Sequence, residues 1–335
     1  MIRFVFAVVL SLGLTASSLA GTIDAGAIND AAYPAKRPAG DKINASVVKL
    51  QILLDRALFL PGEIDGKLGD NAQKALRAFA QANGLSFDKS PPPELWDRLL
   101  AASEGAVIAD YKIAEADVKG PFLKRLPEKM EKMKNLKALS YTSPREALAE
   151  KFHMSEELLR TLNPGKRFDR AGEVIAVANV LTHRKPANIS RIEVDKTQQT
   201  VTAFDPSNHI VAFFPATVGS SERPTPGGAL QVISSDAKPT YRYNPDYNFP
   251  GVNAKTPFTI RPGPNSPVGS YWIGLSAQGY GIHGTPDPDK IGKSASHGCV
   301  RLTNWGARFL GENVRRGTPV VFIDAPIGSV SKTRA

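Results

Sequence analysis

The hydrophobic periodicity of the chain changes near Ile189, and this change constrains the fold more than any other feature of the sequence. Upstream, apolar residues recur every three or four positions, as they do on the buried face of a helix. Downstream, they alternate with polar residues, as at Ile192, Val194 and Val201. The sequence therefore predicts helical units followed by a β-rich domain over residues 189–324.

Short strands separated by glycine and proline turns fill this β-rich domain. After a first hairpin they are expected at residues 209–218, 230–233, 271–275, 281–283, 300–302 and 319–323. One helix, from Thr303 to about Arg316, interrupts them with Val314 on its apolar face. We expect a multidomain protein whose mainly-β domain is a sandwich or barrel with one packed helix. A small helical domain and a small α+β module precede it.

The first helical unit is expected over residues 45–100. The turn at residues 61–66 separates two helical patterns, and Asp70 stands where it would cap the second. The landmarks of the unit are Leu50-Gln51, Pro61-Gly62, Asp65-Gly66 and Gly69. Their placement resembles the peptidoglycan-binding domain 1 family, and this resemblance implies peptidoglycan as a partner.

A second small unit is expected over residues 138–180. Ser143 followed by proline and then Glu146 is a strong helix start, and Ser155 starts another helix. A strand follows at residues 172–177, while the opening strand, roughly residues 138–141, is weak. The order resembles a LysM module, which implies sugar binding. A structural spacer is the alternative.

The remaining segments are expected to be linkers, a leader and a tail. Residues 21–44 and 101–137 are interpreted as linkers, and residues 325–335 as a C-terminal tail. Residues 1–20 have a short basic start, an apolar run of eleven residues and small residues before the expected cleavage point. This pattern predicts a signal peptide and a protein of the periplasm or cell envelope. The apolar run is too short for a comfortable transmembrane span, and no later stretch approaches 18 apolar residues. An uncleaved anchor is the alternative, and no cysteine follows the run to take a lipid anchor.

The chain is basic, with 42 Lys and Arg against 32 Asp and Glu and a formal net charge of +10. Such a surface favours an anionic polymer as partner. Basic runs interleaved with aromatic residues are missing, which argues against nucleic acid. Anionic lipid and an anionic cell-wall polymer stay open as partners, because charge alone does not choose between them, and both suit the predicted export.

Cys299 is the only cysteine, and it stands in Ser296-His297-Gly298-Cys299. A buried structural thiol is one explanation, and a catalytic thiol is the other. A second His-Gly pair, His283-Gly284, begins sixteen positions before the cysteine. A nearby imidazole can activate a thiol and later protonate a leaving amine. Gly298 lets the backbone beside the thiol turn tightly, and Ser296 can hold that turn by local hydrogen bonds.

The two His-Gly pairs, with their flanking residues 263–269 and 281–285, closely resemble the L,D-transpeptidase (YkuD, ErfK-YbiS-YcfS-YnhG-like) catalytic domain over residues 189–324. The resemblance implies a cysteine acyltransferase that needs no cofactor and no metal. By this likeness Cys299 attacks the third residue of a tetrapeptide stem and expels D-alanine, and His283 is the base. Backbone N–H groups of His297, Gly298 and Cys299 form the oxyanion hole, while the Gly284 carbonyl orients His283.

Further residues are expected to contact the substrate. They are Arg301, Thr285, Tyr241 and Trp272. Arg301 replaces the asparagine of one common form of the family motif, which we interpret as a subtype. Residues 241–267, rich in Tyr, Asn and Pro, are expected to form a lid, with an ordinary long loop as the alternative.

Several alternatives stay open at this stage. The acyl acceptor is a stem amine, which gives a 3-3 cross-link, or a lysine of an outer-membrane lipoprotein, or water in an L,D-carboxypeptidase. A zinc hydrolase would use His283, His297 and Cys299 as ligands, but lacks a general-base motif such as His-Glu-x-x-His. A non-catalytic wall-binding protein is the remaining class.

Overall fold

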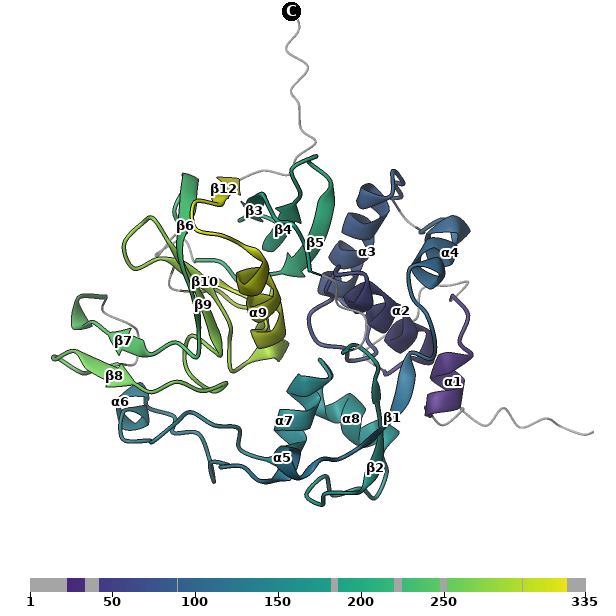
Figure 1. Ribbon diagram of the computed structural model, residues 1–335, viewed down its shortest axis with the longest axis horizontal. Helices are drawn as coiled ribbons and strands as arrows, with labels where there is room; N and C mark the ends of the chain where they lie inside the picture. Colours follow the sequence, from purple (N-terminus) through teal and green to yellow (C-terminus); the bar gives the residue numbers. More distant parts are fainter. Residues whose placement is uncertain are drawn as a thin grey trace, which may run out of the picture.

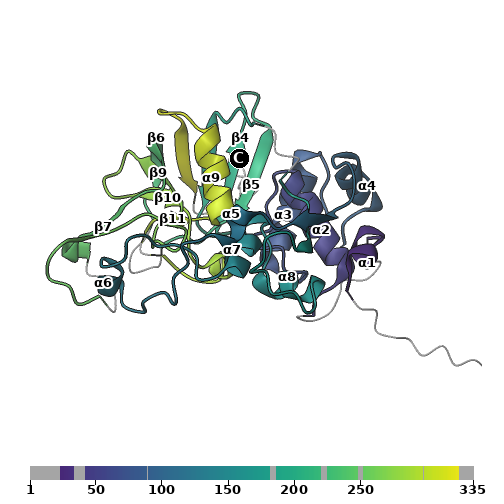
Figure 2. The same cartoon turned by 60° about the horizontal axis from the view of Figure 1, so that its bottom comes forward.

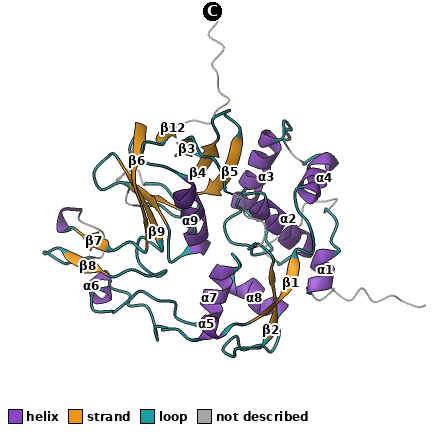
Figure 3. Cartoon of the chain, viewed as in Figure 1, coloured by secondary structure: helices purple, strands orange, loops and turns teal. Residues whose placement is uncertain are grey.

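The two halves of the chain form the two kinds of structure that the change in periodicity predicts. The computed structural model describes residues 23–33, 42–88, 90–181, 186–219, 225–247, 252–296 and 298–323. Most helices gather on one side and the long sheet on the other, with α9 and α6 on the side of the sheet, as Figures 1 and 3 show. The predicted signal peptide, the tail and His297 lie outside the described residues.

The first helical domain consists of α2 (Ala45–Arg56), α3 (Asp70–Ala82) and α4 (Pro93–Ala101). The buried Gln51 side chain organises the turn between α2 and α3, because its Oε1 accepts from the Gly66 N–H at 2.7 Å and its Nε2 donates to Asp65 Oδ1 at 2.8 Å. Gly66 has φ +74°, a conformation that favours glycine. Asp70 is the first residue of α3 and Gly69 is its N-cap, so the capping role predicted for Asp70 is wrong.

The expected linker at residues 21–44 contains a helix, α1 (Ala25–Asn29). Asp24 caps it by accepting from the Ala27 N–H at 2.8 Å, and Ile28 is fully buried. The Asn29 side chain bonds to both backbone groups of Ile108. The linker prediction is therefore wrong for the described part of this segment. An N-cap at Asp24 and one buried apolar side chain, Ile28, are enough to hold a short helix on the core.

The second module has its opening strand earlier than expected. Strand β1 (Ile108–Lys112) pairs antiparallel with β2 (Val174–Ala178), and α7 (Pro144–Lys151) and α8 (Glu156–Leu162) lie between them in the chain. Residues 138–141 form no strand. The linker predicted at 101–137 thus contains β1 and two one-turn helices, α5 (Glu115–Val118) and α6 (Met130–Met133). Burial of Ile108 and Ile113 on the core draws this segment into the sheet.

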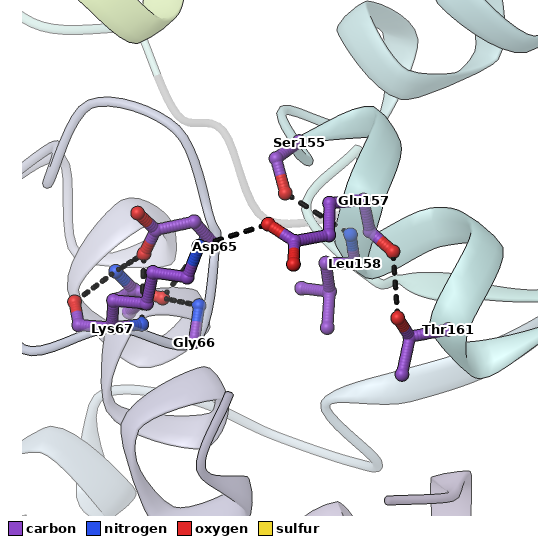
Figure 4. A network of polar contacts seen from close by, with 8 residues as sticks. Asp65, Gly66, Lys67, Ser155, Glu157, Leu158 and Thr161 are labelled. Carbon is purple, nitrogen blue, oxygen red and sulfur yellow. Dashed lines mark hydrogen bonds and ion pairs between the residues drawn. The ribbon is translucent and has the colours of Figure 1, made fainter. Parts of the chain in front are cut away.

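A single apolar core joins the first helical domain to the second module. It extends from Ile28 through α2, α3 and α4 to β1, α7, α8 and β2. Ile64 exchanges backbone hydrogen bonds with the turn after α7, donating to His153 O at 2.8 Å. Figure 4 shows Lys67 of the first domain reaching Glu157 of α8, with Nζ and Oε2 2.8 Å apart. The two predicted modules therefore fold as one packed unit.

The C-terminal domain is one strongly curled sheet of eight strands, in the order β11-β10-β9-β6-β12-β3-β4-β5. Its strands are β3 (Arg191–Asp195), β4 (Thr200–Phe204), β5 (Ile210–Pro215), β6 (Gly228–Ala237), β9 (Tyr271–Leu275), β10 (Gly281–His283), β11 (Val300–Arg301) and β12 (Pro319–Ile323). Thr217, just after β5, exchanges two backbone hydrogen bonds with Arg301 of β11, at 2.8 and 2.9 Å. The two edges of the sheet therefore meet, which gives a barrel-like closure.

Helix α9 (Asn304–Asn313) packs against β9, β6 and β10 of this sheet. Thr303 caps it by accepting from the Gly306 N–H at 3.1 Å, and Phe309 and Leu310 are buried in the core. The helix ends at Asn313, so the predicted end at Arg316 is wrong. Val314 is still buried, but as the extended residue that follows the helix.

The segment between α5 and α7 leaves its own module and runs along the C-terminal domain. Figures 1 and 2 both show α6 beside the two-stranded sheet of β7 (Tyr241–Tyr243) and β8 (Phe258–Ile260). The Asn253 N–H donates to Glu131 Oε1 at 2.7 Å, and the Leu139 N–H donates to Pro262 O at 3.0 Å. Within the described ranges no helix is long and apolar enough to cross a bilayer.

Candidate active site

Strand pairing brings the two His-Gly segments together. Strand β10 lies between β9 and β11, with His283 opposite Trp272 on one side and opposite Arg301 on the other. The Leu302 N–H donates to His283 O at 2.8 Å, which fixes the register. Because β10 and β11 run parallel with Ile282 beside Val300, Cys299 falls beside Gly281, two positions from His283, and the alternation of side chains puts the thiol and the imidazole on the same face of the two strands.

His283 is almost fully buried, with 4% of its surface exposed. Its Nδ1 lies 2.7 Å from the Gly284 carbonyl oxygen. A carbonyl oxygen only accepts, so Nδ1 carries the proton and Nε2 keeps a lone pair. The ring stacks on Trp272 with 5.4 Å between centroids and 17° between planes. The imidazole is therefore held in the tautomer and orientation that a base at Nε2 requires.

Trp272 packs closely on the strand that carries His283. A Cβ at Gly281 would lie 2.4 Å from the indole, a separation that side chains do not tolerate. Glycine at 281 thus allows the indole to cover β10 and stack on His283. The expected substrate-contact residue Trp272 is half-buried and is also part of the wall of the histidine site.

The turn before Cys299 is held by Ser296. Its N–H donates to Val218 O at 2.7 Å, and its Oγ accepts from the Gly298 N–H at 3.1 Å and donates to the Cys299 carbonyl at 2.5 Å. Gly298 has φ +113°, where residues with a Cβ are strained. The Cys299 thiol lies 3.7 Å from the Gly279 carbonyl, as a weak donor. Ser296 therefore hydrogen-bonds to the backbone on both sides of this turn.

The Cys299 thiol and the His283 imidazole are both biased toward their neutral forms. Burial, together with the nearby positive charge of Arg301, lowers the pKa of His283 to about 3, against a smaller opposing effect of the Gly284 carbonyl. Burial also raises the pKa of the Cys299 thiol, while the Gly281 backbone and Arg301 act in the opposite direction. Both shifts favour a protonated thiol and a neutral imidazole at neutral pH.

Arg301 lies in β11, directly opposite His283. Burial lowers the pKa of its guanidinium, and Cys299, Asp287 and Tyr241 are the groups whose charges oppose that effect. Among the described residues its side chain makes no hydrogen bond and no ion pair within 4 Å. A partly buried, unpaired guanidinium beside the thiol is a suitable receptor for a carboxylate.

The other expected substrate contacts are placed differently. Thr285 is buried, and its Oγ1 accepts from the Asp287 N–H at 3.2 Å, so it shapes the turn after His283. Tyr241 begins β7, opposite Ile260 of β8, and it is among the groups that oppose the lowering of the Arg301 pKa. Residues 248–251 of the expected lid lie outside the described part of the chain.

The first helical domain touches the loop that leads to Cys299. Asn71, at the start of α3, donates from Nδ2 to Ile291 O at 2.9 Å, and a Cβ at Gly292 would lie 2.5 Å from its Oδ1. The Gly292 N–H donates to Thr217 Oγ1 at 3.0 Å. Sequence reasoning did not single out Asn71, because a surface asparagine in a helix start carries no signal of a contact more than two hundred residues away.

Known protein families and named relatives are similar to both parts of this chain. The L,D-transpeptidase catalytic domain matches residues 189–322, and a peptidoglycan binding domain matches residues 44–99. YkuD of Bacillus licheniformis, whose name assigns it to the L,D-transpeptidases, is 30% identical over 178 residues, which cover 52% of this chain and 90% of that protein. The chain belongs to the L,D-transpeptidase family.

Another named relative and two solved structures are also similar to this chain. YbiS of Escherichia coli K12, named as an L,D-transpeptidase, is 28% identical over 199 residues, covering 57% of this chain and 63% of that protein. L,D-transpeptidase 3 of Mycobacterium tuberculosis is 19% identical, with a TM-score of 0.34 over 47% of this chain and 72% of that one. The catalytic domain of the E. faecium L,D-transpeptidase is 24% identical, with a TM-score of 0.32 over 41% of this chain and 98% of that one.

Proposed function

We propose that this protein is a peptidoglycan L,D-transpeptidase with Cys299 as nucleophile and His283 as general base. The observation that carries the proposal is the tautomer of His283, which leaves Nε2 free to take a proton, on the strand beside Cys299. Family membership supports the same reaction. The substrate is a tetrapeptide stem, whose third residue presents the carbonyl of an L-centre.

In the first half-reaction the thiol proton passes to His283 Nε2 while Sγ of Cys299 bonds to the carbonyl carbon. The negative charge of the tetrahedral intermediate develops on oxygen, and the N–H groups of His297 and Cys299 are the proposed donors to it, since the Gly298 N–H predicted as a third donor already binds Ser296 Oγ. When the C–N bond breaks, the imidazolium gives its proton to the leaving amine. D-Alanine departs and a thioester remains on Cys299.

In the second half-reaction an acceptor amine attacks the thioester. Neutral His283 takes the proton of the amine, the C–S bond breaks, and the thiol is regenerated, so protons and charge balance over the cycle. A stem amine, giving a 3-3 cross-link, is the acceptor we favour. A lipoprotein lysine or water would use the same acyl-enzyme.

Arg301 is proposed to receive a carboxylate of the donor stem. Its guanidinium is partly buried near the thiol and has no carboxylate partner in the described structure. The terminal D-alanine carboxylate lies only two bonds beyond the scissile nitrogen, within reach of such a group. Tyr241 and the β7–β8 hairpin are proposed to cover the donor from the other side.

The N-terminal unit is proposed to hold the enzyme on its polymer. The peptidoglycan binding domain match supports this role, and so does the net charge of +10. The βααβ order of β1, α7, α8 and β2 supports the likeness of the second module to LysM. Export through the N-terminal leader belongs to the same proposal, and N-terminal sequencing of the mature protein tests it.

Acylation by a carbapenem, followed by intact-mass spectrometry, tests the catalytic assignment. One drug mass should add to the wild type, and none should add to Cys299→Ala. His283→Gln should slow the adduct by about 100-fold or more, because the base is lost. An adduct on Cys299→Ala at the wild-type rate would refute the assignment. Stoichiometric zinc in protein purified without added metal would instead favour the hydrolase alternative.

The acceptor is identified separately, by mass analysis of muropeptides from cells that lack or overproduce the protein. We expect the amount of 3-3 cross-linked dimers to fall in cells that lack the protein and to rise in cells that overproduce it. A change confined to lipoprotein-linked stems would overturn the preference for cross-linking, and a change confined to tripeptide stems would indicate a carboxypeptidase.

A further inference from the structure

Glu150 and Asn304 form a polar contact between the second module and the catalytic domain. Glu150 lies in the last turn of α7, and Asn304 is the first residue of α9. Asn304 Nδ2 donates to Glu150 Oε2 at 2.9 Å, and the Tyr141 hydroxyl donates to Glu150 Oε1 at 2.6 Å. Both carboxyl oxygens are therefore engaged, one of them across the boundary between the two parts of the chain.

The amide of Asn304 has only one orientation that satisfies its surroundings. Its Oδ1 accepts from the Ser270 N–H at 2.8 Å, while its Nδ2 faces two acceptors, Glu150 and the Pro264 carbonyl at 3.2 Å. Asn304 is 2% exposed, so water cannot replace these partners. A rotated amide would set oxygen against oxygen at Glu150 and N–H against N–H at Ser270. Glu150 thus helps to fix the direction in which Oδ1 points.

That oxygen packs directly on the backbone next to the catalytic histidine. A Cβ built at Gly284 would lie 2.1 Å from Asn304 Oδ1, and the same is true at Gly269. The Gly284 N–H donates to Tyr271 O at 3.1 Å, so Gly284 is held from both sides. Its carbonyl is the group that binds His283 Nδ1. A continuous set of contacts therefore leads from Glu150 through Asn304 and Gly284 to His283.

We propose that Glu150 and Asn304 are positioning residues for His283. Glu150, from the second module, orients the Asn304 amide, which holds Gly284 so that its carbonyl selects the Nδ1–H tautomer of the imidazole. The proposal rests on the role proposed above for His283 as base. It makes the second module part of the active-site framework, whatever it binds.

The role requires an acceptor at position 150, not a charge. Burial raises the pKa of Glu150 to about 7, so both protonation states occur near neutral pH. Each state leaves an oxygen that accepts from Asn304 Nδ2. The charged groups that face this carboxyl are Glu146 of α7 and Arg308 of α9, and their effects on its pKa oppose each other. Glutamine, which also offers an amide oxygen to Asn304 and an N–H to Tyr141, is therefore the conservative replacement.

The test compares Glu150→Ala with Glu150→Gln in the full chain, and Lys151→Ala is the matched control. Lys151 lies next to Glu150 on α7, but binds Asp117 and Tyr111 instead of Asn304. Two readouts are used: ¹⁵N NMR of the His283 imidazole, which reports the tautomer without any substrate, and the rate of acylation by a carbapenem. We expect Glu150→Ala to mix the two tautomers and slow acylation about 10- to 100-fold, as a small misplacement of a reacting group does. Glu150→Gln and Lys151→Ala should keep the wild-type tautomer and rate.

The proposal is overturned if folded Glu150→Ala keeps both the tautomer and the rate, or if Lys151→Ala or Glu150→Gln impairs them as much. If Glu150→Ala does not fold, a second comparison decides, between Asn304→Asp alone and Asn304→Asp combined with Glu150→Gln. Asn304→Asp alone should impair both readouts, and adding Glu150→Gln should restore them in part, because an amide N–H then faces the new carboxylate. Absence of that recovery would also overturn it. A wild type that resists acylation would contradict the proposed function only, since the imidazole spectrum tests the positioning independently.

Discussion

His153 Nδ1 lies 2.9 Å from Oδ2 of Asp55, in a contact where both side chains are almost completely buried. The same imidazole stacks on Trp305, with 4.9 Å between ring centroids and 6° between planes. Asp55 belongs to α2, His153 to the turn after α7, and Trp305 to α9. One histidine therefore joins the first helical domain, the second module and the catalytic domain.

Removing Asp55 should destabilise the whole chain, because the buried imidazole would lose its carboxylate. We expect Asp55→Ala to lower the free energy of unfolding by about 3–5 kcal/mol, as for a broken buried pair. Urea denaturation followed by Trp fluorescence measures this. Asp70→Ala, which removes the ion pair of the exposed Asp70 carboxylate with Lys74, is the control and should cost less than about 1 kcal/mol. Equal losses in the two variants would contradict the structural importance of the buried contact.

Alkylation of Cys299 by iodoacetamide should become faster as the pH rises through and above 8. The pKa of the thiol is raised and that of His283 is lowered to about 3, so a thiolate–imidazolium pair is disfavoured in the resting enzyme. Small alkylating agents report the thiolate fraction directly. A rate that already reaches its plateau below pH 7 would show that the ion pair exists.

Replacing Arg301 should weaken recognition of a carboxylate-bearing donor. We expect Arg301→Gln to lower kcat/KM for a tetrapeptide by about 10- to 100-fold and Arg301→Lys to lower it less, because a single charge keeps part of the attraction. A donor amidated at its terminal carboxylate supplies the control. Wild-type enzyme should lose activity on it, and Arg301→Gln should discriminate little between the two donors. If Arg301→Gln discriminates between the two donors as strongly as wild type does, the donor carboxylate binds at a residue other than Arg301.

Stability should depend on pH through Glu63, which faces the loop before Cys299. Burial, followed by the negative charges of Asp289 and Asp65, raises the pKa of Glu63 to about 8. The folded state therefore holds this proton more tightly than the unfolded state, and stability falls as the pH rises from about 4.5 to 8. Glu63→Gln should be more stable than wild type by about 2 kcal/mol at pH 9 and equal to it near pH 4.

Thermal unfolding at the two pH values checks the Glu63 prediction. Exposed Glu104, replaced by Gln, serves as the control and should show no such difference between the two pH values. If Glu63→Gln is no more stable than wild type at pH 9, the Glu63 carboxyl ionises in the folded chain without loss of stability.

Local signals in the sequence predicted much of the catalytic domain. Strands β9, β10 and β12 coincide with the predicted ranges, because alternation between glycine turns defines short strands well. In the second module the helix starts predicted at Ser143 and Ser155 are confirmed as N-caps, because residue type and position define such caps locally. The predicted linkers were wrong, because they contain α1 and β1. Both elements are too short to show a periodic pattern, and they are stabilised mainly by packing on distant elements, α2 and β2.

The sequence by itself determined the chemistry that this protein has available: a single cysteine, a histidine in each of two His-Gly pairs, and the turn residues around them. It could do so because a nucleophile and its base are recognised by residue type and local spacing. Only the tertiary structure decided which groups hold that site. The contacts of Asn304 with Glu150, of Asn71 with Ile291 and of His153 with Asp55 each join residues far apart in the chain. Such contacts leave no local pattern, because they are set by the packing of separate elements against one another and not by the periodicity of any one of them.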